Sequence, residues 1–282
     1  MTHGQPPILF EGVSLTIEGR QFFDDVDFEV TEGETVVVAG PTGCGKSLLL
    51  RLVLGLPGML GLPGMAAGQV EVSGGIQVCG QVMSALCTNE IRVLRRQIGT
   101  VFRGGGLIDN MDVYRNITLP LYYHCYDIMS SQQMDARCRR LLADLGIEQL
   151  DQIGRRPVTL NGLERVYVAL ARAFIADPYI LLLDDPASGL ESRTAAHLME
   201  KVIYEPQFVD GIAIHERSDL PMTRVIVTTE LDHYLPYGDR FFVIDRMGLM
   251  EVGDRNEVIN CSLDVVKNLV AFDNRTAKNM EF

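Results

Sequence analysis

The sequence lacks the features that mark membrane-spanning, secreted and metal-clustered proteins. No apolar run approaches the roughly 20 residues that a spanning helix needs, and residues 1–7 do not have the charged and then apolar pattern of a secretory signal. None of the six cysteines forms a C-x-x-C pair, which argues against a zinc site or a disulfide framework. We therefore expect a soluble, cytoplasmic protein with reduced thiols.

A basic block is also missing. The formal net charge is -12 over 282 residues, and the charges are spread along the chain. Nucleic acids and anionic lipids both attract clustered Lys and Arg, so this balance argues against a nucleic-acid partner and against direct adhesion to a lipid surface. We expect any membrane contact to go through a protein partner.

The sequence does contain a glycine-rich loop between a predicted strand and a predicted helix. Residues 35–39 are mostly β-branched, as in a buried parallel strand, and residues 46–54 are an apolar-rich segment typical of a helix. The loop that joins them consists of Gly40, Pro41, Thr42, Gly43, Cys44, Gly45, Lys46 and Ser47. This arrangement of strand, loop and helix is typical of a nucleotide-phosphate site.

Each part of this loop has a chemical role in phosphate binding. Gly40 and Gly45 allow consecutive backbone N–H groups to face the phosphates, Lys46 reaches the terminal phosphates, and the Ser47 hydroxyl coordinates Mg²⁺. A second predicted strand, at residues 179–183, ends in Asp184, where a carboxylate that orients the metal is expected. The sequence therefore predicts ATP and Mg²⁺ as ligands.

The remaining pattern alternates between helices and strands. Strands are predicted at 98–102, 225–228 and 241–244, a hairpin at 13–30, and a short strand pair at 69–78. Helices are predicted at 88–97, 161–176 and 192–204, with a helical stretch from 111 to 150 in which Ser130 and Ser131 are candidate N-caps, and two short helices after 254. This alternation predicts a parallel sheet with helices on both faces and a helical insertion. The duplicated Gly-Leu-Pro-Gly-Met segments at 55–59 and 61–65 predict a surface loop.

Residues 184–190, Asp-Asp-Pro-Ala-Ser-Gly-Leu, resemble the corresponding segment of the ABC transporter ATPases. The preceding Leu-Ala-Arg-Ala at 170–173 and Asp-Pro at 177–178 extend the resemblance, which covers nearly the whole chain. It implies an α/β fold: a P-loop NTPase (RecA-like) core with an antiparallel β-subdomain and an α-helical ABC subdomain. The implied division gives the core 1–102 and 161–252, the helical subdomain 103–160, and a C-terminal helical tail 253–282.

Within that family, residues 101–121 are most similar to bacterial Mla/Mce-type lipid-trafficking ATPases. The resemblance implies a dimer of ATP-binding subunits under an integral membrane permease, with each ATP held between one phosphate loop and the partner's signature motif. It also implies a peripheral position on the inner face of the bacterial inner membrane and an Mce-type lipid-binding protein as a further partner. The segment 264–270 resembles one that lies across the neighbouring subunit.

The chain departs from the family pattern at the residues that act on the nucleotide. Arg103 stands where a glutamine is expected, which replaces a neutral amide with a cation. The signature segment, commonly Leu-Ser-Gly-Gly-Gln, contains Asn161, Gly162, Leu163 and Glu164 after Leu160. Leu163 replaces a glycine that lets the helix N-terminus approach the γ-phosphate, and Glu164 is expected to place a negative charge near an anion site.

Further departures affect the acid and the histidine of the site. Asp185 fills the catalytic glutamate position, where it is one methylene shorter, and a general base must lie within about 3 Å of its water. Thr229 fills the switch-histidine position, and we expect His215 and His233 to be surface residues outside that register. The position of the adenine-stacking aromatic is Ile17, so no adenine contact is assigned.

Two functional hypotheses follow from this pattern. The first is a subunit that binds Mg-ATP and hydrolyses it weakly, as the non-consensus partner of a second, intact ABC ATPase; a homodimer stays open. The second is a nucleotide-sensing regulatory or scaffold protein without a transport role. The apolar and aromatic residues after Arg103, in the region that forms the permease groove in the family, favour transport.

Overall fold

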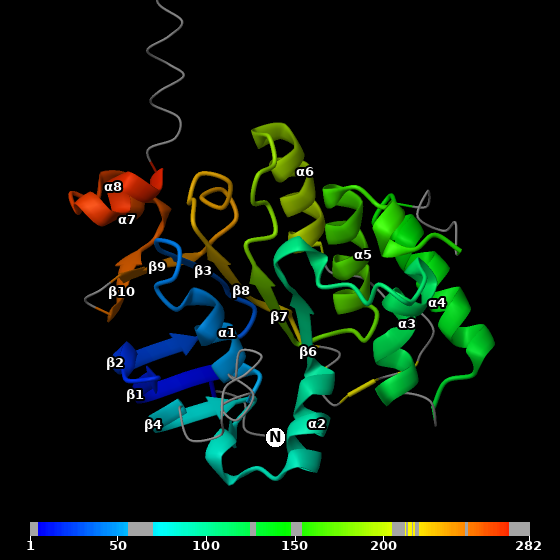
Figure 1. The fold of residues 1–282 in the computed structure, drawn as a ribbon, viewed down its shortest axis with the longest axis horizontal. Helices are drawn as coiled ribbons and strands as arrows, with labels where there is room; N and C mark the ends of the chain where they lie inside the picture. The colour runs from blue at the N-terminus through cyan, green and yellow to red at the C-terminus, as the bar shows by residue number, and fades with distance from the viewer. Residues whose placement is uncertain are drawn as a thin grey trace, which may run out of the picture.

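The computed structural model describes residues 5–55, 70–124, 128–147, 154–204, 212, 214–215, 217, 220–245 and 248–270. Figure 1 shows a small sheet, a larger central sheet and a group of helices on the far side of the central sheet from the small one. The second copy of the duplicated Gly-Leu-Pro-Gly-Met segment and most of the first lie outside the described residues.

The central sheet has the strand order β10-β9-β3-β8-β7-β6. Its pairs are parallel except for β9 with β10, which is antiparallel. Its strands are β3 (Thr35–Ala39), β6 (Ile98–Val101), β7 (Ile180–Asp184), β8 (Thr223–Thr228), β9 (Arg240–Asp245) and β10 (Gly248–Gly253). Strand β10 was not predicted, because this half-exposed edge strand carries little of the apolar pattern of its neighbours.

Both faces of the central sheet are buried. Along β3, Val36 and Val38 belong to one apolar core, whereas Val37 and Ala39 belong to the other. Helix α1 (Lys46–Val53) packs into the first core, together with the small sheet. Helices α5 (Gly162–Phe174) and α6 (Ser192–Ile203) pack into the second core. Two covered faces explain why these strands are nearly continuous apolar runs.

The small sheet has the order β2-β1-β4-β5. The predicted hairpin is confirmed as β1 (Ile8–Ile17) and β2 (Arg20–Val30). The predicted strand pair at 69–78 is wrong, since β4 is a single strand (Val70–Val78) that pairs with β1 along its length, and β5 (Gln81–Val82) follows it. The glycines at 74 and 75 accompany a register shift in the pairing with β1 and do not form a turn.

The helical stretch predicted at 111–150 contains two helices, α3 (Val113–His124) and α4 (Ser131–Asp144), next to α5 (Figure 1). The predicted cap is confirmed at Ser130, whose hydroxyl accepts a hydrogen bond from the backbone N–H of Gln133. The other helices are α2 (Thr88–Leu94), α7 (Arg255–Asn260) and α8 (Asp264–Val270), and the last two confirm the two helices predicted after 254. Among the described helices, none has the length and apolar character needed to span a membrane.

Candidate functional site

Four parallel strands bring the predicted site residues to one edge of the central sheet. Because β3, β6, β7 and β8 run in the same direction, their carboxyl ends lie at the same edge. The glycine loop follows β3, Arg103 follows β6, Asp184 ends β7 with Asp185 directly after it, and Thr229 follows β8. The ends of parallel strands are the usual place for ligand sites in such sheets, so the topology gathers these residues where chemistry is expected.

The glycine loop adopts a compact turn that ends at the N-terminus of α1. Gly45 is the N-cap, with φ 111°, a left-handed value that a residue with a side chain rarely adopts. As a glycine, Gly45 provides no side-chain acceptor for the first N–H groups of the helix. This loop fits an anionic ligand, because the helix N-terminus carries positive partial charge and presents backbone donors.

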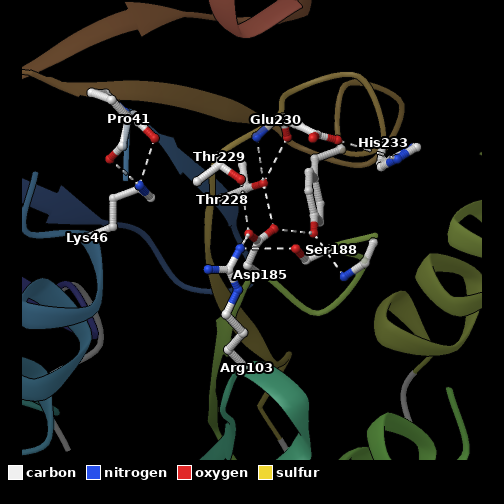
Figure 2. A network of polar contacts seen from close by, with 12 residues as sticks. Pro41, Lys46, Arg103, Asp185, Ser188, Thr228, Thr229, Glu230 and His233 are labelled. Carbon is white, nitrogen blue, oxygen red and sulfur yellow. Dashed lines mark hydrogen bonds and ion pairs between the residues drawn. The ribbon is translucent and has the colours of Figure 1, made fainter. Parts of the chain in front are cut away.

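Lys46 is folded against the loop that precedes it. Its ammonium donates hydrogen bonds to the carbonyl oxygens of Gly40 at 2.7 Å and Pro41 at 2.8 Å, and lies 3.8 Å from the Cys44 sulfur. Figure 2 shows Lys46 beneath Pro41, on one side of the site. The side chain is 8% exposed, so a buried cation is held beside the glycine loop.

Ser47 and Asp184 are the residues that would hold Mg²⁺. Ser47 is in the first turn of α1, and Asp184 is the last residue of β7. Both offer oxygen atoms, which this ion prefers, and Mg²⁺ commonly takes one or two protein oxygens with the rest from water and substrate phosphates. No cluster of three or more His, Cys, Asp or Glu side chains suited to a metal occurs in the described part of the chain.

Arg103 projects from a glycine-rich turn after β6. The turn η4 (Arg103–Gly105) is fixed by two arginines of α5: Arg172 donates to the carbonyls of residues 105 and 106 at 2.9 Å each, and Arg165 contacts that of residue 104 at 3.4 Å. A Cβ at Gly105 would lie 2.7 Å from the backbone oxygen of Arg165, so only glycine permits this approach. The loop is therefore anchored while the Arg103 side chain, 55% exposed, extends over the site.

Asp185 is the centre of a buried polar network, which Figure 2 shows from close by. Its Oδ2 accepts from Arg103 Nη2 at 2.9 Å and from the Thr229 hydroxyl at 3.1 Å. Its Oδ1 accepts from the Thr228 hydroxyl at 3.0 Å and, more weakly, from the Tyr234 hydroxyl at 3.5 Å. The side chain is only 6% exposed, so the ion pair with Arg103 is shielded on the carboxylate side.

The backbone of Asp185 favours aspartate over the expected glutamate. Its φ is 51°, in the left-handed region, where Asp and Asn are tolerated better than most residues. The conformation is held by a hydrogen bond from its own N–H to the Val227 carbonyl at 2.8 Å and by one from the Ser188 N–H to its carbonyl at 3.2 Å. The shorter acid thus suits a turn that brings its carboxylate back under β8.

Comparison with known proteins identifies the architecture that carries this site. The family model described as "ABC transporter" matches residues 23–188, which is more than half of the chain. The chain belongs to the ABC transporter family. The match includes the phosphate loop, Arg103 and the Asp184–Asp185 pair, and members of this family bind ATP, usually with Mg²⁺.

Curated relatives are ATP-binding proteins of import systems. The chain is 29% identical over 250 residues to the sulfate/thiosulfate import ATP-binding protein CysA of Bordetella parapertussis, a match that covers 88% of this chain and 62% of that protein. It is 29% identical to the spermidine/putrescine import ATP-binding protein PotA of Oleidesulfovibrio alaskensis, over 88% of this chain and 57% of the relative. The chain thus spans about three fifths of the length of these relatives.

Solved ABC cassettes share the fold. A dimeric cassette in a post-hydrolysis state, bound to ADP and Pi, matches with a TM-score of 0.68 at 25% identity, over 87% of this chain and 98% of that one. A dimeric bacterial ABC transporter cassette matches with a TM-score of 0.67 at 25% identity, over 84% of this chain and 94% of that one. The fold inferred from the sequence, a P-loop core with an antiparallel sheet, is confirmed.

The segment at the ABC signature position forms the N-terminus of α5. Asn161 is the N-cap and its side chain accepts from the Glu164 N–H at 2.9 Å, while the Glu164 carboxylate accepts from the Asn161 N–H at 2.8 Å. The negative charge of Glu164 has a partner in Arg155, which contacts both of its oxygens, at 3.0 and 3.2 Å. These hydrogen bonds lower the pKa of Glu164. Gly162 opens the helix, and Leu163 packs against the adjoining core.

The two histidines that were expected at the surface are half-buried. The side chain of His233 is 16% exposed and lies 4.0 Å from the Glu230 carboxylate. The His215 ring nitrogen Nε2 lies 2.6 Å from the Asp177 carbonyl oxygen, and burial is the main cause that lowers its pKa. Ile17 is buried in the core beneath the small sheet.

Sequence reasoning did not find three residues of the Asp185 network, which are Thr228, Ser188 and Tyr234. Ser188 accepts a hydrogen bond from Arg103 at 3.0 Å, and the Tyr234 hydroxyl accepts one from the Ala187 N–H at 3.1 Å. Burial, and then the negative charge of Asp185, raise the pKa of Tyr234, which therefore stays protonated and able to donate. Ser188 lies in the family-like segment 184–190, but no sequence signal marks Tyr234, which is 49 residues from Asp185.

Proposed function

We propose that this chain is the ATP-binding subunit of an ABC transporter, that it binds Mg-ATP through its phosphate loop, and that it hydrolyses ATP weakly on its own. Binding rests on Lys46 and the glycine loop, which are complete. Weak hydrolysis rests on one observation: neighbouring side chains already donate hydrogen bonds to the Asp185 carboxylate. The bound ATP would serve mainly to hold two subunits together, while a partner supplies turnover.

The Asp185 carboxylate has little capacity left to act as a general base. An ionised carboxylate offers about four lone-pair sites on its two oxygens. In this site four donor groups lie within hydrogen-bonding distance of it, two at each oxygen. One of them is a cation, and the Thr228 hydroxyl shares its single proton with the Glu230 carbonyl oxygen at 2.8 Å. A base must accept the proton of a water held within about 3 Å, and an aspartate whose two oxygens are already contacted by three hydroxyls is poorly suited to that step even when Arg103 turns away from it.

The direct test compares binding with turnover in the purified full chain. ATP should bind with micromolar to millimolar affinity, as measured by calorimetry, while phosphate release should equal that of Lys46→Ala, in which the loop cation is lost. Robust phosphate release that Lys46→Ala abolishes would overturn the proposal of weak hydrolysis. Absence of ATP binding would overturn the proposed function as a whole.

A groove beside the site supports coupling to an integral membrane permease. It encloses about 340 Å³ between β6, α3 and α5. Its rim includes the exposed side chains of Phe102, Ile108 and Tyr123. Arg95 and Arg96 add positive charge to the lining, in a chain whose net charge is -12. We propose that a cytoplasmic segment of the permease with apolar and acidic side chains docks in this groove.

Two adjacent tyrosines of α3 provide a matched test of this docking. Tyr123 lines the groove and is 67% exposed, whereas Tyr122 is 41% exposed and lines a different hollow. Tyr123→Asp should reduce co-purification of an integral membrane subunit from membranes, and Tyr122→Asp should leave it nearly unchanged. Equal effects of both substitutions would contradict the assignment of the groove.

The same proposal includes a second ATPase subunit and a transported substrate. Loss of consensus residues at positions 103, 163, 185 and 229 favours a heteromeric partner with an intact site over a second copy of this chain. The similarity of residues 101–121 to Mla/Mce-type ATPases favours lipid trafficking with an Mce-type partner, whereas the curated relatives named above favour import of a small solute. Co-purification from membranes, followed by uptake assays with labelled phospholipid, sulfate and polyamine, separates these possibilities.

A second candidate function is a nucleotide-sensing regulatory or scaffold protein with no transport role. The hydrogen-bonded Asp185 carboxylate supports the sensor as much as it supports the transporter subunit, because a sensor needs to bind the nucleotide without hydrolysing it. The two functions differ in their partners. Recovery of the full chain without an integral membrane subunit, in extracts where ATP binding is intact, would favour the sensor.

A further inference from the structure

The Arg103 side chain has hydrogen-bonding capacity that its present contacts do not use. In the part of the chain that the structure describes, only Nη2 of the guanidinium makes hydrogen bonds, to Asp185 and Ser188, although an arginine has five N–H donors. The side chain is 55% exposed, and it extends from an anchored glycine turn. In Figure 2 the guanidinium lies between Asp185 and the side of the site that holds Lys46. It is therefore a cation with free donors at the same edge of the sheet as the phosphate loop.

The charges around Arg103 allow a phosphate group to compete with the Asp185 carboxylate for the guanidinium. Asp184 and Asp185 place two carboxylates at the end of β7, and Glu230 adds a third after β8. A polyphosphate that enters this edge meets their repulsion unless a cation offsets it. Lys46 provides one cation on the loop side and Arg103 another on the carboxylate side. Arginine suits phosphate oxygens well, because its planar fork forms two charge-assisted hydrogen bonds at once.

We propose that Arg103 distinguishes a nucleoside triphosphate from a diphosphate. When a triphosphate occupies the loop, the guanidinium exchanges the Asp185 carboxylate for the terminal phosphate, and with a diphosphate it stays on Asp185. This inference rests on the proposed nucleotide binding and adds a specificity-determining residue to it. The Arg103–Asp185 ion pair is then a competitor of ATP, and the state of Arg103 reports which nucleotide is bound.

The proposal predicts an effect on ATP that ADP does not share. One arginine contact to a phosphate is a charge-assisted hydrogen bond, so its loss should weaken ATP binding about 10-fold to 100-fold. Arg103→Gln should show this loss while the affinity for ADP changes less than about threefold. Arg103→Lys, which keeps the charge without the fork, should fall between Arg103→Gln and the wild type.

The Asp185 carboxylate provides the opposite test. Asp185→Asn removes the charge that competes for Arg103 but keeps a side chain that suits the left-handed backbone. It should therefore tighten ATP binding without tightening ADP binding. In the double variant Arg103→Gln/Asp185→Asn this gain should disappear, because no cation is left to be released.

The experiment is calorimetric titration of the full chain with ATP, with a non-hydrolysable ATP analogue and with ADP, each in Mg²⁺ and in EDTA. The ATP preference should persist in part in EDTA, since a protein cation supplies it. Arg115→Gln is the matched control, because this arginine of α3 is 70% exposed and pairs with Asp112 away from the site. Equal losses for ATP and ADP in Arg103→Gln, or an unchanged ratio, would overturn the inference while leaving nucleotide binding intact. No binding of either nucleotide to the wild type would overturn the proposed function as well.

Discussion

The phosphate loop and the carboxylates at the end of β7 lie at the same edge of one sheet, but backbone groups shape the first and side chains shape the second. The loop is a backbone structure, in which carbonyl oxygens hold Lys46 and a left-handed glycine starts α1. The β7 side is a side-chain structure, in which Asp185 is held by Arg103 and by two threonine hydroxyls. The geometry of a backbone site changes little when neighbouring side chains are substituted. In a side-chain site, substitutions can replace the contacts while the fold is kept.

The loop side should show the largest effect when its single essential side chain is removed. Lys46→Met is expected to weaken ATP binding at least about 100-fold, because the terminal phosphates lose their ammonium contact in a partly buried site. Lys267→Met provides the control, since this lysine of α8 is exposed and distant in sequence. Calorimetric affinities measure both. Similar affinities for the two variants would show that the loop does not hold the nucleotide.

The β7 side should show its largest effect in stability. Asp185→Ala is expected to lower the free energy of unfolding by about 2–3 kcal/mol, because Arg103 loses its ion-pair partner and the hydroxyls of Thr229 and Tyr234 lose an acceptor. Asp184→Ala removes the adjacent carboxylate, which accepts no side-chain hydrogen bond within the described ranges, and should change stability by less than about 0.5 kcal/mol. Urea unfolding of both variants measures the difference. Equal losses would mean that the network contributes nothing beyond the charge.

The difference between the two sides also explains what the sequence could reveal. Residues 40–47 are contiguous, so their spacing alone predicted a strand, a phosphate loop and a helix, as the structure has them. The contacts of Asp185 join three strands, with partners 82, 43 and 49 residues away, and no local pattern encodes such pairings. The departures at Arg103, Asp185 and Thr229 were visible one by one. Their meeting in a single network was not.

At the signature position too, the local contact could be predicted from the sequence and the more distant one could not. The pairing of Asn161 with Glu164 is local, three residues apart, and its side chains are of the types that cap helices. The partner of the Glu164 charge, Arg155, lies nine residues away across a turn, and no local pattern predicts that pairing. The edge strand β10 was missed for a related reason, since its pairing with β9 supplies the order that its own sequence pattern does not.

A smaller effect is expected at the signature segment, where a charge pair stabilises the start of α5. Glu164→Gln keeps a side chain that can cap Asn161 but loses the ion pair with Arg155, so the free energy of unfolding should fall by about 1 kcal/mol at pH 7. Because Arg155 lowers the pKa of Glu164, this stabilisation is complete above the ordinary value of 4.5 and is lost as the pH falls through the lowered pKa. Urea unfolding at pH 7 and at progressively lower pH should show the two proteins converge.

An exposed ion pair provides the control for that measurement. Asp135 and Arg139 on α4 are 42% and 47% exposed, so Asp135→Asn should cost at most about 0.5 kcal/mol. If Asp135→Asn and Glu164→Gln lose the same stability with the same dependence on pH, the partly buried pair at α5 has no special role.

The smallest effect is expected at Cys44, and it tests the backbone character of the loop directly. The Cys44 sulfur lies 3.8 Å from the Lys46 ammonium, whereas the two carbonyl oxygens that hold Lys46 lie at 2.7 and 2.8 Å. The carbonyls therefore position the ammonium, and the thiol contributes only a weak contact. Cys44→Ser, which preserves the small size of the side chain, should change calorimetric ATP affinity by less than about threefold. A loss approaching that of Lys46→Met would show that a side chain, and not the backbone alone, shapes the phosphate loop.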